Sequence, residues 1–554
     1  MEFNVNDKIN RKGIDGIDEI GCIDEKVNYV SGSGNDSNRI IVFDTTLRDG
    51  LQAARNVLAE DRMKIAYALK DLGVDVIEAG FPAASREIYN SVHDIAQNVG
   101  TKDGPIICGL SRIAEGDIKK AAEAIEPAYN KRIHTFIATS DLHIKHKFNS
   151  SRKEIMERAV KGVSYAKKFS DDVQFSLEDF GRTDDDYAIN LIEKVISAGA
   201  TTINLPDTVG YLKPDRFHEK VKYVIDGVRS MNIDATFSVH THNDRGLATA
   251  TTIAGLEAGA RQAEVTINGI GERAGNAALE ELVFNIHRGD ICDGSGKKLY
   301  VEINSGKIGP ASRQVSEITD MVVQPNKAVV GNNAFFHSSG IHQDGMLKNR
   351  DTYEIAKPMD YGMESVLGYN GQSGRKAIIH KYKSLGIDIN NQDNENNNFD
   401  EIANTFFEIT GNAMKKPDDA DFIRAYHKGE EIPKHYSLKS YHPIVGVEDK
   451  IGVVVNFMEG ETLRQEYAEG NGQVDAAINA IKKIVFPETK ITEFNVAAGG
   501  PGSYAEGYAN STLKKNGWEI RGQGRSTDIV NSGIEAFLDG CNRLKYIQEK
   551  LHHY

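Results

Sequence analysis

Two histidines stand two residues apart at the end of a strand-like run, in His240-Thr-His242-Asn-Asp244. The preceding residues 235–239, Ala-Thr-Phe-Ser-Val, are typical of a buried strand. On a strand, residues two apart point to the same face, so the two imidazoles are expected side by side. Such a pair can form half of a divalent-metal site, or it can simply cap the strand with hydrogen bonds. A third ligand close to the pair would favour the metal site over the strand cap.

Asp49 is the candidate third ligand, because it follows the first strand-like run of the chain. If the strands close into a barrel, the first and seventh strands bring Asp49 close to His240 and His242. One carboxylate and two imidazoles leave coordination positions open, as a catalytic metal requires. This ligand set suits Mg²⁺, Mn²⁺, Zn²⁺ or Co²⁺, and the sequence does not choose among them. Such an ion can act as a Lewis acid on a 2-oxo acid.

Arg48 directly precedes that aspartate, so its guanidinium could donate to the alkoxide that forms when the carbonyl is attacked. A salt bridge within the barrel mouth is its alternative role.

The scaffold is predicted from an alternation of short β-branched runs with amphipathic stretches of helical spacing. The strand-like runs span residues 40–44, 74–79, 106–110, 133–138, 173–177, 201–205, 236–240 and 264–268. Eight such units over roughly 250 residues predict a (β/α)₈ TIM barrel at residues 39–308, with an open doubly wound sheet as the alternative. Polar residues gather where these runs end, which is where a TIM barrel places its active site.

The rest of the chain changes character twice. Residues 309–430 are predicted to form helical linker subdomains, which include the polar run 390–398. Residues 431–554 combine strand-like runs at 437–447, 450–457 and 492–497 with helices at 474–484 and 528–544.

Each C-terminal helix follows a Gly-x-Gly sequence, Gly470-Asn-Gly472 and Gly522-Gln-Gly524, interpreted as a turn. Their spacing of 52 residues predicts a duplicated α+β module of the βββα type. A module of this kind appended to a barrel enzyme more often binds an effector or a partner than does chemistry. A purely structural use of the glycines is the alternative.

Composition narrows the range of partners. The 554 residues carry a net charge of −14, which argues against nucleic acid and anionic membranes as partners. The four cysteines show no CxxC spacing and no apolar run is long enough to span a bilayer, so we expect a cytoplasmic protein. Residues 1–38 lack the features of a signal or transit peptide and are predicted to be a flexible extension.

Three long motifs resemble the isopropylmalate/homocitrate synthase family of DRE-TIM metallolyases. They are Phe43-Asp-Thr-Thr-Leu-Arg-Asp-Gly-Leu-Gln52, His240-Thr-His-Asn-Asp244 and Gly269-Ile-Gly-Glu-Arg-Ala-Gly-Asn276. Residues 40–554 also resemble the family in layout, with a barrel, a connector and a leucine-sensing module whose resemblance rests on Gly522–Ile529. The chain departs from the family pattern at Leu51, where Glu is usual, and at Gln372, where His is usual.

The resemblance implies a metal-dependent, Claisen-type condensation of acetyl-CoA with a 2-oxo acid, followed by thioester hydrolysis. The expected oxo acid is 3-methyl-2-oxobutanoate, because the apolar Leu110 suits an isopropyl group, and leucine is the expected feedback effector. Homocitrate or citramalate synthesis is the alternative within the family. A non-catalytic effector-binding protein on an inactivated barrel is the alternative from another class.

The resemblance also implies roles for individual residues. The residues expected at the metal are Asp49, His240, His242 and Asn276. Those expected around the oxo acid are Leu110, His134, Ser176, Asn204 and Thr208. Those expected to take part in catalysis are Arg48, which polarises the carbonyl, and Glu178, His342 and Tyr353. Those expected in the regulatory domain are Gly522, Gly524, Ser526 and Asp528.

In the family pattern, His342 and Tyr353 reach the barrel of the neighbouring subunit and assist deprotonation of acetyl-CoA. The resemblance therefore implies a domain-exchanged homodimer.

Overall fold

The computed structural model describes residues 37–54, 56–369, 373–387, 389, 399–411, 416–444, 451–498 and 505–551. The predicted extension 1–38, except for its last two residues, lies outside the described residues, as do Gln372 and the polar run 390–398. The chain divides into two compact units, and the boundary between them lies between Val323 and Gln324. We call them the barrel unit and the C-terminal unit and describe each by itself.

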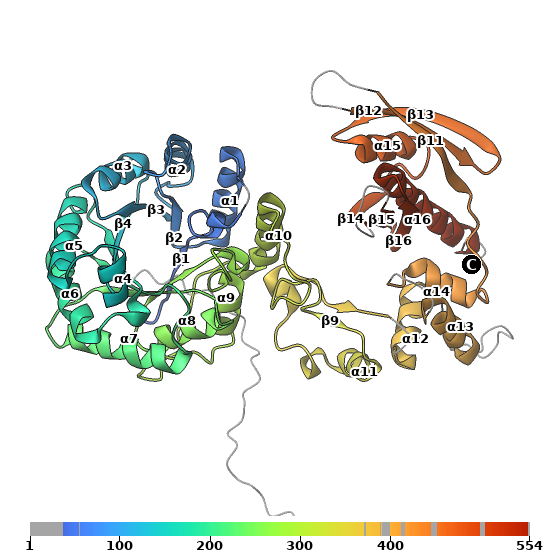
Figure 1. The fold of residues 1–554 in the computed structure, drawn as a ribbon. Coiled ribbons are helices and arrows are strands. Elements are labelled where there is room, and N and C mark those ends of the chain that lie inside the picture. Colours follow the sequence, from blue (N-terminus) through green and yellow to red (C-terminus); the bar gives the residue numbers. More distant parts are fainter. Residues whose placement is uncertain are drawn as a thin grey trace, which may run out of the picture. The chain divides into compact units, whose positions relative to one another are not determined.

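The predicted TIM barrel is confirmed: eight parallel strands close into a barrel, with β8 paired to β1 (Figure 1). The strands are β1 (Ile41–Asp44), β2 (Val76–Gly80), β3 (Ile106–Arg112), β4 (Lys131–Ala138), β5 (Val173–Glu178), β6 (Thr202–Asp207), β7 (Thr236–Thr241) and β8 (Gln262–Val265). Only the eighth differs clearly from the prediction of residues 264–268, because the chain turns into a short 3-10 helix at Ile267–Gly269.

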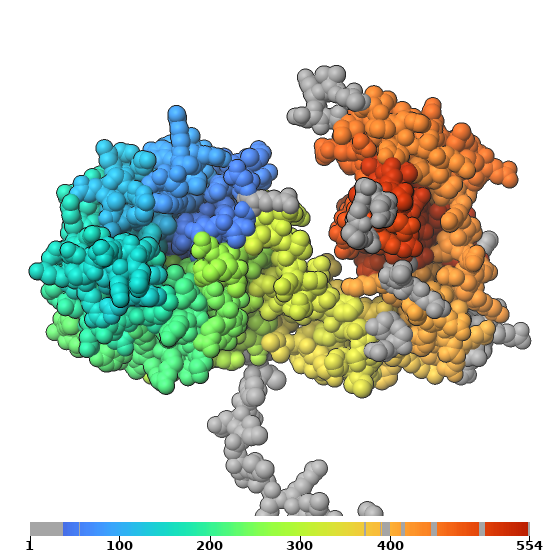
Figure 2. Space-filling view, viewed as in Figure 1, coloured from blue at the N-terminus to red at the C-terminus, as the bar shows by residue number. Residues whose placement is uncertain are grey.

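Ten helices of the barrel unit are described, and those between successive strands form its outer layer (Figures 1 and 2). They are α1 (Ala59–Leu72), α2 (Arg86–Asn98), α3 (Glu115–Ile125), α4 (Asp141–His146), α5 (Arg152–Ala166), α6 (Asp185–Ser197), α7 (Pro214–Arg229), α8 (Ala248–Glu257), α9 (Leu279–His287) and α10 (Ile308–Thr319). The start of α5 shows why such helices form here, since Ser151 and Glu154 make a reciprocal capping box. None of the described helices is long and apolar enough to cross a bilayer.

The inside of the barrel has an apolar part and a polar part. Phe43, Val76 and Cys108 make an apolar cluster inside β1–β3. Elsewhere a hydrogen-bonded chain runs from Gln262 Nε2 to Gln174 Oε1 (2.9 Å) and from Gln174 Nε2 to Glu264 Oε1 (2.6 Å). Because these polar groups hydrogen-bond one another, the network holds the carboxylate of Glu264 in a fixed position.

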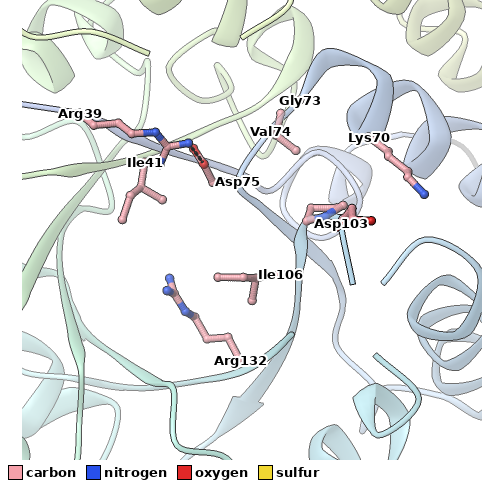
Figure 3. A pocket seen from close by; sticks show the side chains of 11 residues that line it. Arg39, Ile41, Lys70, Gly73, Val74, Asp75, Asp103, Ile106 and Arg132 are labelled. Carbon is pink, nitrogen blue, oxygen red and sulfur yellow. Dashed lines mark hydrogen bonds and ion pairs between the residues drawn. The ribbon is translucent and has the colours of Figure 1, made fainter. Parts of the chain in front are cut away.

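A pocket of about 350 Å³ lies at the end of the barrel where the strands begin (Figure 3). Arg39 and Asp75 form an ion pair at its edge, and the guanidinium of Arg132 lies in its wall, with Nε 2.8 Å from the carboxylate of Asp172. Paired charges at this end of a TIM barrel serve stability, whereas the opposite end carries the chemistry.

The C-terminal unit starts with short elements and continues into helices and two three-stranded sheets (Figure 1). The first elements are β9 (Phe336–His337), α11 (Gly340–Lys348), β10 (Val366–Leu367), α12 (Arg375–Ser384), α13 (Phe399–Gly411) and α14 (Asp419–Tyr426). The later ones are β11 (Tyr436–Ile444), β12 (Ile451–Glu459), β13 (Thr462–Gly470), α15 (Gln473–Lys482), β14 (Lys490–Ala498), β15 (Gly507–Lys515), β16 (Trp518–Ser526) and α16 (Ile529–Leu551).

One hydrophobic core joins α12–α14 to the two sheets, because its buried residues run from Ile378 to Ile547. A buried ion-pair cluster reinforces the junction: the guanidinium of Arg543 lies 3.0 Å from Asp418 Oδ2 and 2.6 Å from Asp421 Oδ1. Removing one partner of such a cluster would leave a buried charge uncompensated. Cutting the chain near 430 would therefore disrupt α14 as well as remove the sheets.

The predicted duplication is present, but the number of residues between the two repeats differs from the one expected. β12, β13 and α15 begin at residues 451, 462 and 473, whereas β15, β16 and α16 begin at 507, 518 and 529. The offset is 56 residues in each case, not the 52 that separate the two Gly-x-Gly sequences. Within each repeat the helix packs on its own sheet, α15 on β12–β13 and α16 on β15–β16 (Figure 1).

The turn predicted at Gly522 and Gly524 is wrong, because both glycines lie inside β16. They allow the strand to approach α16 closely: a Cβ added to Gly522 would lie 1.9 Å from the carbonyl oxygen of Ala536. A Cβ on Gly524 would lie 1.9 Å from the carbonyl oxygen of Ser532. Glycine is used here because it has no side chain, not because it turns.

Replacing Gly524 by alanine is expected to lower the free energy of unfolding of the C-terminal unit by about 3 kcal/mol, the upper part of the range for overpacking. The clash is with helix backbone, which cannot move aside as a flexible side chain would. Gly472→Ala is the matched control, since the space around Gly472 is open. Denaturant unfolding measures both variants, and equal stability of the two would contradict the packing role.

Candidate metal centre

Three side chains converge at the ends of β1 and β7. The Nε2 atoms of His240 and His242 lie 3.0 Å apart, and each lies 3.5 Å from Asp49 Oδ2. All three residues are buried. The expected grouping of one carboxylate and two imidazoles is thus present in the structure, although the residues come from positions about 190 apart in the chain.

The ligand atoms fit a divalent cation. Asp49 Oδ2 makes no hydrogen bond within the described part of the chain, and neither does Asn276 Oδ1. Buried polar atoms are normally paired, so unsatisfied acceptors beside two facing imidazoles point to an ion. Asn276 is bridged to His242 by backbone hydrogen bonding, which brings its amide to the same place. Asp49, His240 and His242 are therefore a candidate metal site, with Asn276 beside it.

The glycine-rich loop at residues 269–276 sets the position of Asn276. Gly275 has a φ of +88°, and a Cβ on it would lie 2.0 Å from the carbonyl oxygen of Gly269. Asn276 N donates to Gly269 O at 2.9 Å, and its side-chain Nδ2 donates to Ile270 O at 3.0 Å. The Gly-rich motif is therefore needed for a tight loop that presents Asn276.

Electrostatics keep the ligands in the protonation states that metal binding needs. Burial disfavours ionisation of Asp49, but the neighbouring charge of Arg48 is the main effect that outweighs it and holds the pKa of Asp49 below its ordinary value. Burial, together with the neighbouring His240, lowers the pKa of His242 to about 3. An ionised carboxylate and a neutral imidazole are the forms that bind cations.

Glu264 lies behind His240, on the side of the ring away from Asp49. Its Oε2 lies 3.0 Å from Nδ1 of His240, and its Oε1 accepts the hydrogen bond from Gln174. A carboxylate at this place behind a candidate metal ligand helps to set the orientation of the ring. The sequence predicts that Glu264 lies in a strand but does not assign it a role. The alternation of side chains along β8, which points Glu264 into the barrel, is the feature that could have indicated one.

Arg48 lies beside the centre, as expected. Its Nη1 is 3.4 Å from Asp49 Oδ1, and its Nε donates to Glu78 Oε2 at 2.6 Å. Burial disfavours the charged guanidinium, but Glu78 and Asp49 outweigh burial and raise its pKa above the ordinary value. Arg48 is thus a permanently charged donor at the mouth of the barrel.

Four of the residues expected around the oxo acid lie together inside the barrel. His134 Nε2 lies 2.6 Å from Ser176 Oγ, and Asn204 Nδ2 donates to the same oxygen at 2.8 Å. Leu110 is the neighbour of His134 in the register of β3 and β4, and it is also buried. These four side chains combine polar groups with one apolar wall.

Other expected residues have partners of their own. The carboxylate of Glu178 is held by Lys147, whose Nζ lies 2.7 Å from Oε1 and 2.9 Å from Oε2. Thr208 Oγ1 accepts from the backbone N–H of Asp179 at 2.9 Å, so it braces the loops at the barrel mouth. Lys147 was missed by sequence reasoning, because nothing in the sequence ties it to Glu178.

In the C-terminal unit, His342 and Tyr353 come together. Their ring centroids are 4.2 Å apart, and both side chains are exposed. Of the regulatory candidates, Asp528 caps α16 by accepting from Val530 N at 2.8 Å, and it also accepts from Tyr441 Oη at 2.8 Å. Ser526 Oγ accepts from the N–H of Asp528 at 3.1 Å.

Comparisons with known proteins agree with this architecture. The chain matches three family models: HMGL-like at residues 39–312, homocitrate synthase post-HMGL domain-like at 329–405, and LeuA allosteric (dimerisation) domain at 416–545. A 2-isopropylmalate synthase of Parabacteroides distasonis is 43% identical over 92% of this chain and 99% of its own length. Those of Crocosphaera subtropica and Nitrosomonas europaea are 43% and 41% identical, over 92% and 93% of this chain and 96% and 99% of theirs.

Proposed function

Because this chain belongs to the 2-isopropylmalate synthase family, we propose that it condenses acetyl-CoA with 3-methyl-2-oxobutanoate and hydrolyses the thioester, giving 2-isopropylmalate and CoA. Such an activity makes it an acyltransferase of leucine biosynthesis. The observation that carries the proposal is the convergence of Asp49, His240 and His242 beside Arg48 in the barrel mouth. An inactivated barrel would not be expected to retain these groups in one place.

The metal centre supplies the electrophilic half of the reaction. A divalent cation held by Asp49, His240 and His242 would act as a Lewis acid on the oxo acid, and Mg²⁺, Mn²⁺, Zn²⁺ and Co²⁺ all suit the ligands. Arg48 donates to the keto oxygen, where negative charge develops during attack. A donor that is already buried and oriented needs no reorganisation as that charge forms.

The layer of His134, Ser176 and Asn204 is the proposed binding site for the polar end of the oxo acid. Leu110 supplies the apolar wall for its branched side chain. A second carboxylate, as in 2-oxoglutarate, would meet this leucine instead of a cation. Apolar pockets separate substrates by only about 1–3 kcal/mol per methylene, so 2-oxobutanoate is expected to react weakly.

His342 is the proposed base that removes a proton from the methyl group of acetyl-CoA. This methyl is a weak carbon acid, so a positioned base is required. Tyr353 packs against the imidazole of His342 and orients it. Glu178, at the end of β5, is the proposed partner of these groups in the barrel mouth. We propose that His342 and Tyr353 act in the barrel of a second subunit, as a domain-exchanged homodimer would require.

A thiol-release assay with acetyl-CoA and a panel of 2-oxo acids tests the proposal. The expected order of kcat/KM is 3-methyl-2-oxobutanoate first, then 2-oxobutanoate and pyruvate, with 2-oxoglutarate inactive. Preference for 2-oxoglutarate would favour homocitrate synthesis, and preference for pyruvate would favour citramalate synthesis. If no oxo acid supported release of CoA, the effector-binding alternative would replace the enzyme.

We also propose that leucine inhibits the enzyme through the C-terminal unit, and millimolar leucine is expected to lower thiol release by the whole chain. The match to the LeuA allosteric (dimerisation) domain and the duplicated βββα units support this. Ser526 ends β16 and Asp528 caps α16, and these two are the residues proposed to take part in the response, whereas Gly522 and Gly524 act through packing. Isoleucine is the control ligand. A rate that ignores leucine would contradict the assignment.

We propose a cytoplasmic location for the reaction. Of the cysteines in the described residues, Cys108, Cys292 and Cys541 are free thiols, as a reducing compartment favours.

A further inference from the structure

Glu78 is a fully buried carboxylate on β2 with three donors around it. Its Oε2 accepts from Thr45 Oγ1 and from Arg48 Nε, both at 2.6 Å. Its Oε1 lies 2.6 Å from Nδ1 of His134. One side chain therefore ties the loop after β1 to the middle of β4.

The charge of Glu78 determines which way the neighbouring hydrogen bonds run. Burial would raise its pKa, but Arg48 and His134 outweigh burial and hold the pKa below its ordinary value. An ionised carboxylate only accepts hydrogen bonds, so Nδ1 of His134 must carry the proton that it donates. On its other side, Nε2 of His134 lies 2.6 Å from Ser176 Oγ, which accepts from Asn204 Nδ2.

We propose that Glu78 is a positioning residue that locks Arg48 and His134 into one rigid unit, so that the two sides of the oxo-acid pocket keep a single spacing. The inference rests on the proposed function, since it assumes that Arg48 and His134 hold the oxo acid. Glu78 itself is placed behind these groups and touches neither the metal ligands nor the substrate in this scheme.

Asp75 provides the matched comparison. It is a half-buried carboxylate just before the same strand, and it pairs with Arg39 and accepts from the N–H of Val42 at 2.7 Å. It lies at the opposite end of the barrel, beside the pocket in Figure 3. A variant at Asp75 therefore reports what the loss of one carboxylate–arginine pair does to the barrel alone.

The test compares Glu78→Gln with Asp75→Asn in the full chain, with Mg²⁺, acetyl-CoA and 3-methyl-2-oxobutanoate. Glutamine has the shape of glutamate, but one of its ends donates and so cannot accept from both Arg48 and His134. Glu78→Gln is expected to lower kcat/KM for the oxo acid about 100-fold, the scale of a misplacement near 1 Å. The KM for acetyl-CoA and the affinity for Mn²⁺ should stay as in the wild type. Asp75→Asn should leave all three quantities unchanged.

A second variant, Glu78→Asp, keeps the buried negative charge but is one methylene too short to reach both partners. Because the buried charge is kept, this variant is expected to fold, and it is also expected to lower kcat/KM for the oxo acid. The inference is overturned if both Glu78 variants match Asp75→Asn, or if the oxo acid, acetyl-CoA and Mn²⁺ parameters all worsen together with the thermal midpoint. A wild-type chain that releases no CoA with any oxo acid would instead overturn the proposed function, which is a separate result.

Discussion

Replacing Asp49 by alanine is expected to abolish metal-dependent release of CoA. Asp49 supplies the carboxylate of the metal site, and its Oδ2 is equidistant from the two histidine nitrogens. Without it, two neutral imidazoles would have to hold the cation and neutralise none of its charge. Since a bound cation contributes several kcal/mol to stabilising the transition state, kcat/KM should fall by at least about 10³-fold.

Calorimetric titration with Mn²⁺ should show the cause directly, as a loss of binding in Asp49→Ala. Asp75→Asn, which removes a carboxylate at the far end of the barrel, should bind Mn²⁺ like the wild type. If Asp49→Ala kept both its Mn²⁺ affinity and its CoA release, the carboxylate would not be a ligand. The activity would then have to come from another site.

Replacing His342 by alanine is expected to reduce turnover by about 10²–10⁴-fold, the usual contribution of a general base. Binding of the oxo acid should be unaffected, because the residues proposed to hold it lie in the barrel unit. The measurement is kcat by thiol release, together with the dissociation constant of 3-methyl-2-oxobutanoate. Tyr353→Phe separates loss of the tyrosine hydroxyl from loss of packing, since it keeps the ring that lies 4.2 Å from the imidazole.

Subunit mixing tests whether His342 acts in the barrel of a partner. A heterodimer of Asp49→Ala and His342→Ala would contain one site with both defects and one site with neither. Co-expression with random pairing should therefore restore about a quarter of wild-type activity, given a two-fold symmetric exchanged dimer. No recovery, with heterodimers shown to be present, would mean that His342 serves the barrel of its own chain.

The barrel could be predicted because its signal repeats. Eight β-branched runs alternate with amphipathic stretches, and an error in one of them does not change the count. The eighth strand was placed about two residues late, since Ile267 and Asn268 look like strand residues but enter a 3-10 helix. A repeat therefore predicts an architecture more reliably than it predicts any one boundary.

The two glycines of β16 show a limit of local pattern. A Gly-x-Gly sequence has the same appearance whether glycine makes a turn or admits a close neighbour. At Gly522 and Gly524 the neighbour is the backbone of α16, which the local sequence does not reveal. The true repeat of 56 residues emerges only when the strands and helices are aligned with each other.

The metal ligands were predictable, whereas the groups behind them were not. His240 and His242 attract attention because two imidazoles share one face of a strand. Glu264 and Glu78 are single carboxylates within strands, and what they contact comes from elsewhere in the chain. Their role depends on which residues the closed barrel places opposite them, and that requires the register of every strand between.

We propose that one divalent cation, held by Asp49, His240 and His242, would bind and activate the oxo acid. The most direct measurement is a crystal structure with Mn²⁺ and 3-methyl-2-oxobutanoate, recorded with anomalous scattering. One anomalous peak is expected within bonding distance of all three side chains, with the keto oxygen and the carboxylate of the oxo acid beside it. A peak elsewhere, or an oxo acid bound with no ion between Asp49 and the two histidines, would contradict it.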